Sequence, residues 1–201
     1  DVLREYFFTR HLLTPEDTVF NGIRLIKAGH LLEYNLDDMQ FNQVLKRELY
    51  NYIDPGVIEK NRKRSNEDIL EEFEAILLST AKSLVPISRD YFSVFSGGID
   101  SSLSSIYLSE CKEAKEYIAL TFPEKDNVSS QIGEFAKVLR RSIYAKTVDP
   151  ESFAVAFDNC YKATCTPLPT HSFVSQSIMS KVVRENGVKV LIGGDGADEL
   201  F

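Results

Sequence analysis

Residues 90–102 constrain the fold of this chain more than any other segment. The run over 90–95 is aromatic and β-branched in character and predicts a strand, which ends where Ser96-Gly97-Gly98 begins. Helical signals resume at once, so the segment predicts a junction of strand, loop and helix. Such a junction directs several unpaired backbone N–H groups at one point, with the positive end of the helix dipole behind them. The sequence therefore predicts a pocket for a phosphate-sized anion.

The side chains of this loop indicate what kind of anion it holds. Gly97 and Gly98 let the backbone approach a ligand closely, because they carry no Cβ. Asp100 would repel a phosphate unless a cation such as Mg²⁺ lay between them. The hydroxyl groups that can donate hydrogen bonds to phosphate oxygens belong to Ser96, Ser101 and Ser102. Together these residues favour a metal–polyphosphate ligand, such as a nucleotide, over the alternative of an ordinary glycine turn with serine and aspartate helix caps.

A second segment near the end of the sequence has the same organisation. The apolar run 188–192 predicts a strand, and it is followed by the glycine-rich acidic stretch Gly193-Gly194-Asp195-Gly196-Ala197-Asp198-Glu199-Leu200-Phe201. Taken alone, Asp198 and Glu199 are also explained by the general preference for acidic residues at helix N-termini. Considered together with the first loop, these acidic residues favour a ligand site that the two loops share.

The two motifs together resemble the synthetase domain of the asparagine synthetase family, which includes β-lactam synthetases and related amidotransferases. Ser-Gly-Gly-Ile-Asp-Ser-Ser at 96–102 is similar to the pyrophosphate loop of ATP pyrophosphatases, and it lacks the spacing of other glycine-rich phosphate loops. The stretch at 196–201 is similar to the family's second motif. The resemblance implies an enzyme that uses ATP and Mg²⁺ to adenylate a carboxylate, by default aspartate, with release of pyrophosphate. Ammonia from glutamine, or another amine, then forms the amide.

The resemblance also implies roles for individual residues. Asp100 and Asp198 correspond to the magnesium ligands. Asp195 corresponds to a general base or amine-positioning carboxylate, with a loop-capping role as the alternative. The adenine is expected to lie against the backbone near Phe95, Leu120 and Gly194. The residues expected to bind ATP and its pyrophosphate are Ser96, Gly97, Gly98, Asp100, Ser101, Ser102 and Gly193.

From residue 65 onward, helix and strand signals alternate along the chain. Strands are predicted at 90–95, 117–122, 143–148 and 188–192. Helices are predicted from about 65 to 84 and at 101–111, 128–141, 151–163 and 172–186. Such alternation predicts parallel strands with right-handed crossovers, in a doubly wound α/β domain. Because ligands of these folds bind where the strand order reverses, Asp100 and Asp198 would face one triphosphate if strands 90–95 and 188–192 are neighbours.

The first part of the sequence is of a different kind. Residues 1–50 resemble the tail of the family's glutaminase domain, with strands near 23–26 and 31–34 that predict a hairpin. Residues 51–64 are polar, contain Pro-Gly and are expected to form a linker, and 65–201 would be the synthetase domain, truncated at its C-terminus. The family's glutaminase uses an N-terminal cysteine, whereas residue 1 here is Asp. Either the chain is a fragment of a longer protein, or ammonia comes from elsewhere.

Composition narrows the class of partner. The net charge of −7 disfavours a nucleic-acid binder with a broad basic surface, and no apolar stretch reaches the ~20 residues that span a bilayer. Three cysteines without a zinc spacing indicate a reduced, cytoplasmic setting. The expected partners are a small-molecule carboxylate and an amine or ammonia donor, without nucleic acid or membrane, in a protein that can form a homodimer.

Three alternatives stay open. A different pyrophosphate-loop enzyme, such as a tRNA thiolase or a GMP or NAD synthetase, fits the first motif but not the loop at 193–199. An inactive or regulatory ATP-binding partner fits both motifs. An amidotransferase acting on an amino-sugar or natural-product carboxylate also fits, because Thr164-Cys165-Thr166-Pro167 differs from the Asp-Glu-Pro that relatives often carry near the acceptor site.

Overall fold

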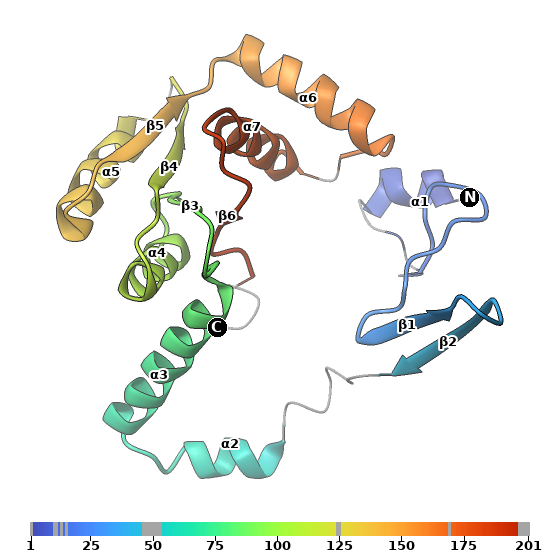
Figure 1. The fold of residues 1–201 in the computed structure, drawn as a ribbon, viewed down its shortest axis with the longest axis horizontal. Helices are drawn as coiled ribbons and strands as arrows, with labels where there is room; N and C mark the ends of the chain where they lie inside the picture. Colours follow the sequence, from blue (N-terminus) through green and yellow to red (C-terminus); the bar gives the residue numbers. More distant parts are fainter. Residues whose placement is uncertain are drawn as a thin grey trace. The chain divides into compact units, whose positions relative to one another are not determined.

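The computed structural model describes residues 2–9, 12, 14, 16–45, 54–123, 126–168 and 170–196. The chain divides into two compact units, Asp1–Asn66 and Glu67–Phe201 (Figure 1). The second unit contains both glycine-rich segments, so its architecture is the one that positions the candidate site.

The first unit contains helices and one antiparallel hairpin. Its described elements are α1 (Val2–Thr9), β1 (His30–Asn35), β2 (Gln40–Leu45) and α2 (Pro55–Asn61). Helix α2 lies within the segment expected to be a linker. It begins there because Asp54 accepts a hydrogen bond from the backbone N–H of Gly56 (2.7 Å) and a proline occupies the first helical turn.

The hairpin lies further along the chain than the sequence predicted. Its turn is formed by residues 36–39, and the segment 23–26, predicted as a strand, is not one. Side-chain oxygens explain the position of the turn, because asparagine and aspartate can bond the backbone two residues on. Here Asn35 Oδ1 accepts a hydrogen bond from the N–H of Asp37 at 2.9 Å.

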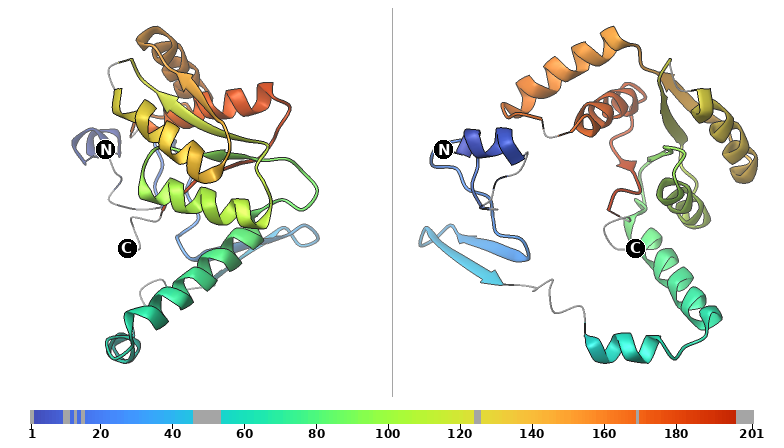
Figure 2. Two further views of the ribbon diagram at one scale, coloured as in Figure 1. Left: turned by 90° about the vertical axis from the view of Figure 1, so that its left-hand side faces the viewer. Right: turned by 180° about the vertical axis from the view of Figure 1, so that it is seen from behind.

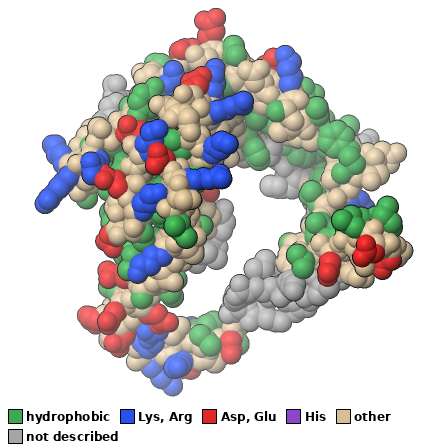
Figure 3. Space-filling view, viewed as in Figure 1, with side chains coloured by type: hydrophobic (Ala, Val, Ile, Leu, Met, Phe, Trp, Pro, Cys, Tyr) green, Lys and Arg blue, Asp and Glu red, His purple; other side chains and the backbone are tan. Residues whose placement is uncertain are grey.

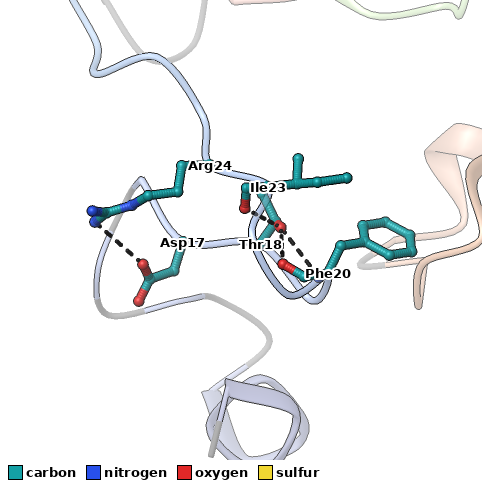
Figure 4. A network of polar contacts seen from close by, with 5 residues as sticks. All are labelled: Asp17, Thr18, Phe20, Ile23 and Arg24. Carbon is teal, nitrogen blue, oxygen red and sulfur yellow. Dashed lines mark hydrogen bonds and ion pairs between the residues drawn. The ribbon is translucent and has the colours of Figure 1, made fainter.

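Where the first strand of the hairpin was predicted, the chain forms a turn closed by one threonine (Figure 4). Thr18 Oγ1 donates to the carbonyl of Ile23 (2.6 Å) and accepts from the N–H of Phe20 (3.1 Å). An exposed ion pair between Asp17 and Arg24, 3.5 Å long, spans the same turn. Such side-chain bonds to the backbone compete with strand pairing.

The second unit alternates strands and helices as the sequence predicted. Its strands are β3 (Phe92–Val94), β4 (Glu116–Thr121), β5 (Ile143–Thr147) and β6 (Leu191–Ile192). Its helices are α3 (Asn66–Leu84), α4 (Ile99–Cys111), α5 (Asp126–Leu139), α6 (Pro150–Thr164) and α7 (Ser172–Glu185). Each of these elements overlaps a predicted one, because apolar periodicity follows directly from which faces are buried.

The strands of this unit form one parallel sheet in the order β5-β4-β3-β6. From β3 the chain moves outward through β4 and β5, and it then returns through α6 and α7 to place β6 on the opposite side of β3 (Figure 1). The strand order therefore reverses between β3 and β6. This confirms the doubly wound α/β fold and the expectation that strands 90–95 and 188–192 are neighbours.

Helices cover both faces of the sheet (Figure 2). On one face, Phe92 and Ile118 pack against Met179, Val182 and Val183 of α7. On the other face, alternate strand residues pack under α3, α4 and α5. Successive side chains of a strand point to opposite faces, so burial on both sides explains why these strands read as continuous apolar runs.

The helices of the second unit carry charged side chains of both signs (Figure 3). Basic and acidic side chains are intermixed over the helices of the second unit on the face seen in Figure 3. None of the helices in the described part of the chain is long and apolar enough to cross a membrane.

Phe135 tests how much the packing of α5 contributes to stability. Its side chain is 9% exposed and its ring stacks on Phe95, with centroids 4.3 Å apart. We expect Phe135→Ala to lower the free energy of unfolding by about 3–5 kcal/mol, because it leaves a cavity in the core. Urea denaturation followed by circular dichroism measures this loss. Val138→Ala on the same helix, where the side chain is 67% exposed, is the matched control, and equal losses in the two variants would contradict the packing.

Candidate functional site

The first glycine-rich loop leaves the start of α4 open. Gly97 adopts a left-handed conformation (φ 88°), and Gly98 occupies the N-cap position, where it cannot supply a capping side chain. Among the described residues, no side chain makes a capping hydrogen bond to this helix. The first N–H groups of an α-helix have no partner within the helix. The backbone N–H groups at this point are therefore available to an anion, and phosphate binding by this loop stays a prediction.

The serine hydroxyls of this loop bond to the loop itself. Ser101 Oγ accepts a hydrogen bond from the backbone N–H of Ser96 (3.1 Å) and lies 3.0 Å from Ser96 Oγ. Ser102 Oγ donates to the carbonyl of Gly98 at 2.7 Å. The hydroxyls predicted to contact phosphate thus hold the loop in shape. Ser101 Oγ also donates to the carbonyl of Gly98 at 3.2 Å, so the hydroxyl hydrogens of Ser101 and Ser102 are both used within the loop.

A buried pair of serines fixes α4 against the sheet. Ser93 Oγ of β3 and Ser105 Oγ of α4 lie 3.0 Å apart, and the two residues are 1% and 0% exposed. A buried hydroxyl needs a partner, and here each hydroxyl satisfies the other. Sequence reasoning did not identify this pair. Its only signal is a small polar residue at an otherwise apolar position of the strand and another on the helix that follows.

The second glycine-rich loop touches the start of α4. Because β6 pairs with β3, Gly193 and Gly194 emerge beside the first loop. A Cβ on Gly194 would lie 2.9 Å from the carbonyl carbon and oxygen of Asp100 and 3.0 Å from the backbone N of Ser101. Contacts this short are essentially never made by a real Cβ, so only glycine permits the observed approach. The first loop and the described part of the second loop, residues 193–196, therefore meet at one place in the structure.

A cavity of about 770 Å³, which we call the loop cavity, lies between these loops and α7. Its polar lining residues are Ser96, Asp100, Ser101, His171, Ser172, Ser175, Gln176, Ser180 and Asp195, and Gly193, Gly194 and Gly196 complete the loops around it. A cavity of this size lies within the range typical of small-molecule sites. It brings the carboxylate-bearing residues Asp100 and Asp195 to one space.

Asp195 is held by a residue that the sequence did not point to. Gln176 of α7 donates a hydrogen bond from Nε2 to Asp195 Oδ2 at 3.3 Å. This contact orients the carboxylate predicted to act as a base or to position the amine. An exposed glutamine on an amphipathic helix carries no sequence signal of such a role, since its partner is supplied by the distant second loop.

Phe95 and Leu120, two residues predicted near the adenine, have side chains that do not line the loop cavity. The ring of Phe95 is 2% exposed and packs in the core under α5, and Leu120 packs against the cluster beneath α7. Within the described part of the chain, the strand residues that line the loop cavity are Val94 and Leu191 instead. The adenine prediction concerned backbone only, and it stays a prediction.

The magnesium prediction rests on Asp100 and Asp198, and only Asp100 lies within the described residues. In those residues no group of three or more His, Cys, Asp and Glu side chains could hold a metal ion. Asp100 lines the loop cavity beside the open helix start. A carboxylate next to an anion-binding backbone fits a site in which a cation accompanies the anion. The residues present are thus compatible with a magnesium–polyphosphate ligand.

Fold and site together define a parallel α/β domain with a glycine-rich anion loop at the point where the strand order reverses. The family model described as asparagine synthase matches residues 72–201. The chain belongs to the asparagine synthase family, as its two motifs implied.

A relative in Methanocaldococcus jannaschii is named as a putative glutamine-hydrolysing asparagine synthetase, and the two sequences are 26% identical over 189 residues. The alignment covers 92% of this chain and 33% of the relative, so the chain spans about a third of that protein.

Two solved structures illustrate the structural likenesses. One is a predicted subunit of tRNA methyltransferase from Methanocaldococcus jannaschii, with 25% identity and a TM-score of 0.39 over 56% of this chain and 58% of that one. The other is glutamine-dependent NAD+ synthetase from Acinetobacter baumannii in complex with ADP, with 13% identity and a TM-score of 0.46 over 84% of this chain and 30% of that one.

The contact between Gly194 and α4 can be tested by adding one methyl group. We expect Gly194→Ala to lower the free energy of unfolding by about 1–3 kcal/mol, because the new Cβ forces the loop away from the helix backbone. Urea denaturation measures the change. Gly193→Ala is the matched control, since its Cβ would meet nothing closer than 3.5 Å. A Gly194 variant as stable as the Gly193 variant would show that the two loops do not touch.

Proposed function

We propose that this chain carries the synthetase domain of an ATP-dependent amide-forming ligase. A substrate carboxylate attacks the α-phosphorus of ATP, the bond to the β-phosphate breaks, and pyrophosphate leaves. An amine then attacks the acyl-adenylate and releases AMP. The observation that carries the proposal is the meeting of two glycine-rich loops at one cavity, at the carboxyl ends of adjacent parallel strands. Family membership supports the same reaction class.

In this proposal, some residues of the loop cavity bind the phosphates and another accepts a proton. The open start of α4 binds the leaving phosphates through backbone N–H groups, and Ser96, Ser101 and Ser102 keep the loop in the binding conformation. Such preorganised donors stabilise charge where it develops in the transition state. Gly194 keeps the second loop close enough for both loops to contact the same polyphosphate.

Asp100 and Asp198 would hold Mg²⁺, which when bound supplies positive charge to the triphosphate. Asp195, oriented by Gln176, accepts a proton from the attacking amine. Aspartate is the default carboxylate of the family. Holding the reactants in line accounts for much of the rate enhancement in such reactions.

The remainder of the proposal concerns the whole protein. Residues 1–50 would be the tail of a glutaminase-like domain that delivers ammonia from glutamine, 51–64 the linker, and 65–201 the synthetase domain. Cys111, Cys160 and Cys165 are free thiols, which agrees with a reduced cytoplasmic setting. A homodimer is part of this proposal.

The decisive experiment measures pyrophosphate release by the full-length protein with ATP, Mg²⁺ and a panel of carboxylates. We expect Asp100→Ala to reduce the rate at least about a hundredfold, since it removes the carboxylate that faces the polyphosphate. Asp158→Ala is the matched control, because this exposed aspartate of α6 pairs with Lys162 one helical turn away on the same helix. Its rate should stay within about twofold of the wild-type rate.

Two outcomes would contradict the proposed ligase activity at this site. Binding of ATP without pyrophosphate release for any carboxylate would instead favour a regulatory nucleotide-binding partner. Equal rates of pyrophosphate release in the Asp100 and Asp158 variants would show that the reaction does not take place in the loop cavity.

A further inference from the structure

A second cavity, of about 490 Å³, lies next to the loop cavity at the carboxyl ends of β4 and β5. We call it the side pocket. It is lined by Phe122, Pro123, Val148, Asp149, Pro150, Phe153 and His171. The backbone N–H of Val148 donates to the carbonyl of Thr121 at 2.8 Å, so the pocket sits where the pairing of these two strands ends. Phe122 and His171 line both cavities, so the two spaces adjoin at these two residues.

The side pocket is apolar in character. Five of its seven lining residues are Phe, Pro or Val, and the side chain of Val148 is 2% exposed. The loop cavity next to it has a mixed lining. Most of its lining residues are Ser, Gly or Asp, and its apolar lining residues are Val94, Phe122, Met179 and Leu191. The two cavities therefore favour two chemically different parts of a ligand, one polar and reactive and the other apolar.

The acidic residue of the side pocket is already engaged. Asp149 caps α6, and its carboxylate accepts hydrogen bonds from the backbone N–H and the hydroxyl of Ser152 at 2.7 and 2.8 Å. These two bonds hold the pKa of Asp149 below its ordinary value, so it is ionised at neutral pH. A second carboxylate entering the pocket would meet a like charge and apolar walls, without a described basic side chain of Lys or Arg among the lining residues.

We propose that the side pocket receives an apolar, ring-sized group of the carboxylate that is activated in the loop cavity. This inference rests on the proposed function and specifies its substrate class. The reacting carboxylate lies by the open start of α4, and its apolar part extends past Phe122 and His171 to pack against Val148 and Phe153. Aspartate has no such part and would leave the side pocket unfilled. The substrate is therefore a carboxylic acid with an aromatic or comparably large aliphatic substituent.

A matched pair of acids tests this with the full-length wild-type protein. 3-Phenylpropanoate and succinate present the same reacting group on the same two-carbon chain, but one ends in a phenyl ring and the other in a carboxylate. We expect kcat/KM for ATP–pyrophosphate exchange to be at least about tenfold higher with 3-phenylpropanoate, since filling an apolar pocket discriminates by this order. Aspartate is measured alongside and should resemble succinate.

Two variants of α6 locate the effect. Phe153→Ser removes an apolar wall of the side pocket and should lower kcat/KM for 3-phenylpropanoate about tenfold or more, through KM for the acid and with KM for ATP unchanged. Phe157→Ser is the matched control, because this phenylalanine lies one turn further along the same helix and is 47% exposed. It should leave every kinetic constant within about twofold.

The outcomes separate this inference from the reaction on which it rests. Exchange that is as fast with succinate or aspartate as with 3-phenylpropanoate overturns the apolar substrate and leaves the ligase standing. Equal effects of the Phe153 and Phe157 substitutions do the same. If none of the tested acids supports ATP–pyrophosphate exchange, both the apolar substrate and the ligase are overturned. The comparison of acids uses the wild-type protein, so it decides the matter even if the Phe153 variant does not fold.

Discussion

The parallel pairing of β3 with β4 on one side and with β6 on the other is the constraint on which the site depends. The chain reaches β6 only after passing through β4 and β5 and returning over the opposite face of the sheet. That return places two loops far apart in sequence at the same end of adjacent strands. The register of Phe92 with Leu191 sets how far each strand extends before its glycines begin. A parallel sheet buried on both faces tolerates little displacement of such a register.

Close backbone contact follows from that register. Gly194 lies against the first turn of α4 at a distance that excludes any side chain, while the helix start itself carries no side-chain cap in the part of the chain that the structure describes. A helix end without a cap forgoes stabilisation that a serine or aspartate at the N-cap would supply. Glycine there keeps the N–H groups accessible to a ligand. The serine bonds of the loop and the buried pair between β3 and α4 hold this open geometry in place.

The two adjoining cavities also lie where parallel strands of this sheet end, and together they are the space proposed for the substrate. Parallel strands end at one edge of the sheet, so every loop that follows a strand can contribute to a common site. The loops after β3 and β6 are glycine-rich and polar, whereas those after β4 and β5 supply aromatic, proline and valine side chains. Residues of α7 line the loop cavity, residues of α6 line the side pocket, and His171 at the N-cap of α7 lines both. In the proposed function, one edge of one sheet binds both a polyphosphate and an apolar acid.

The sequence by itself determined the elements of the second unit and the residue types of its two glycine-rich loops. Strand and helix positions could be predicted because burial imposes a period on apolar residues, and an anion loop because glycine pairs at strand–helix junctions expose backbone N–H groups. The hairpin of the first unit was misplaced, since the oxygen of Asn35 selected a turn that the apolar pattern did not reveal.

Tertiary structure alone decided which residues share a space. Phe95 and Val94 are neighbours in sequence, yet one packs in the core and the other lines the loop cavity, because successive strand residues face opposite sides. Gln176 meets Asp195, and Gly194 meets Asp100, only because β6 returns beside β3. Local patterns report which residue types occur along the chain. Contacts between distant segments depend on strand order, which is set by the packing of the whole domain.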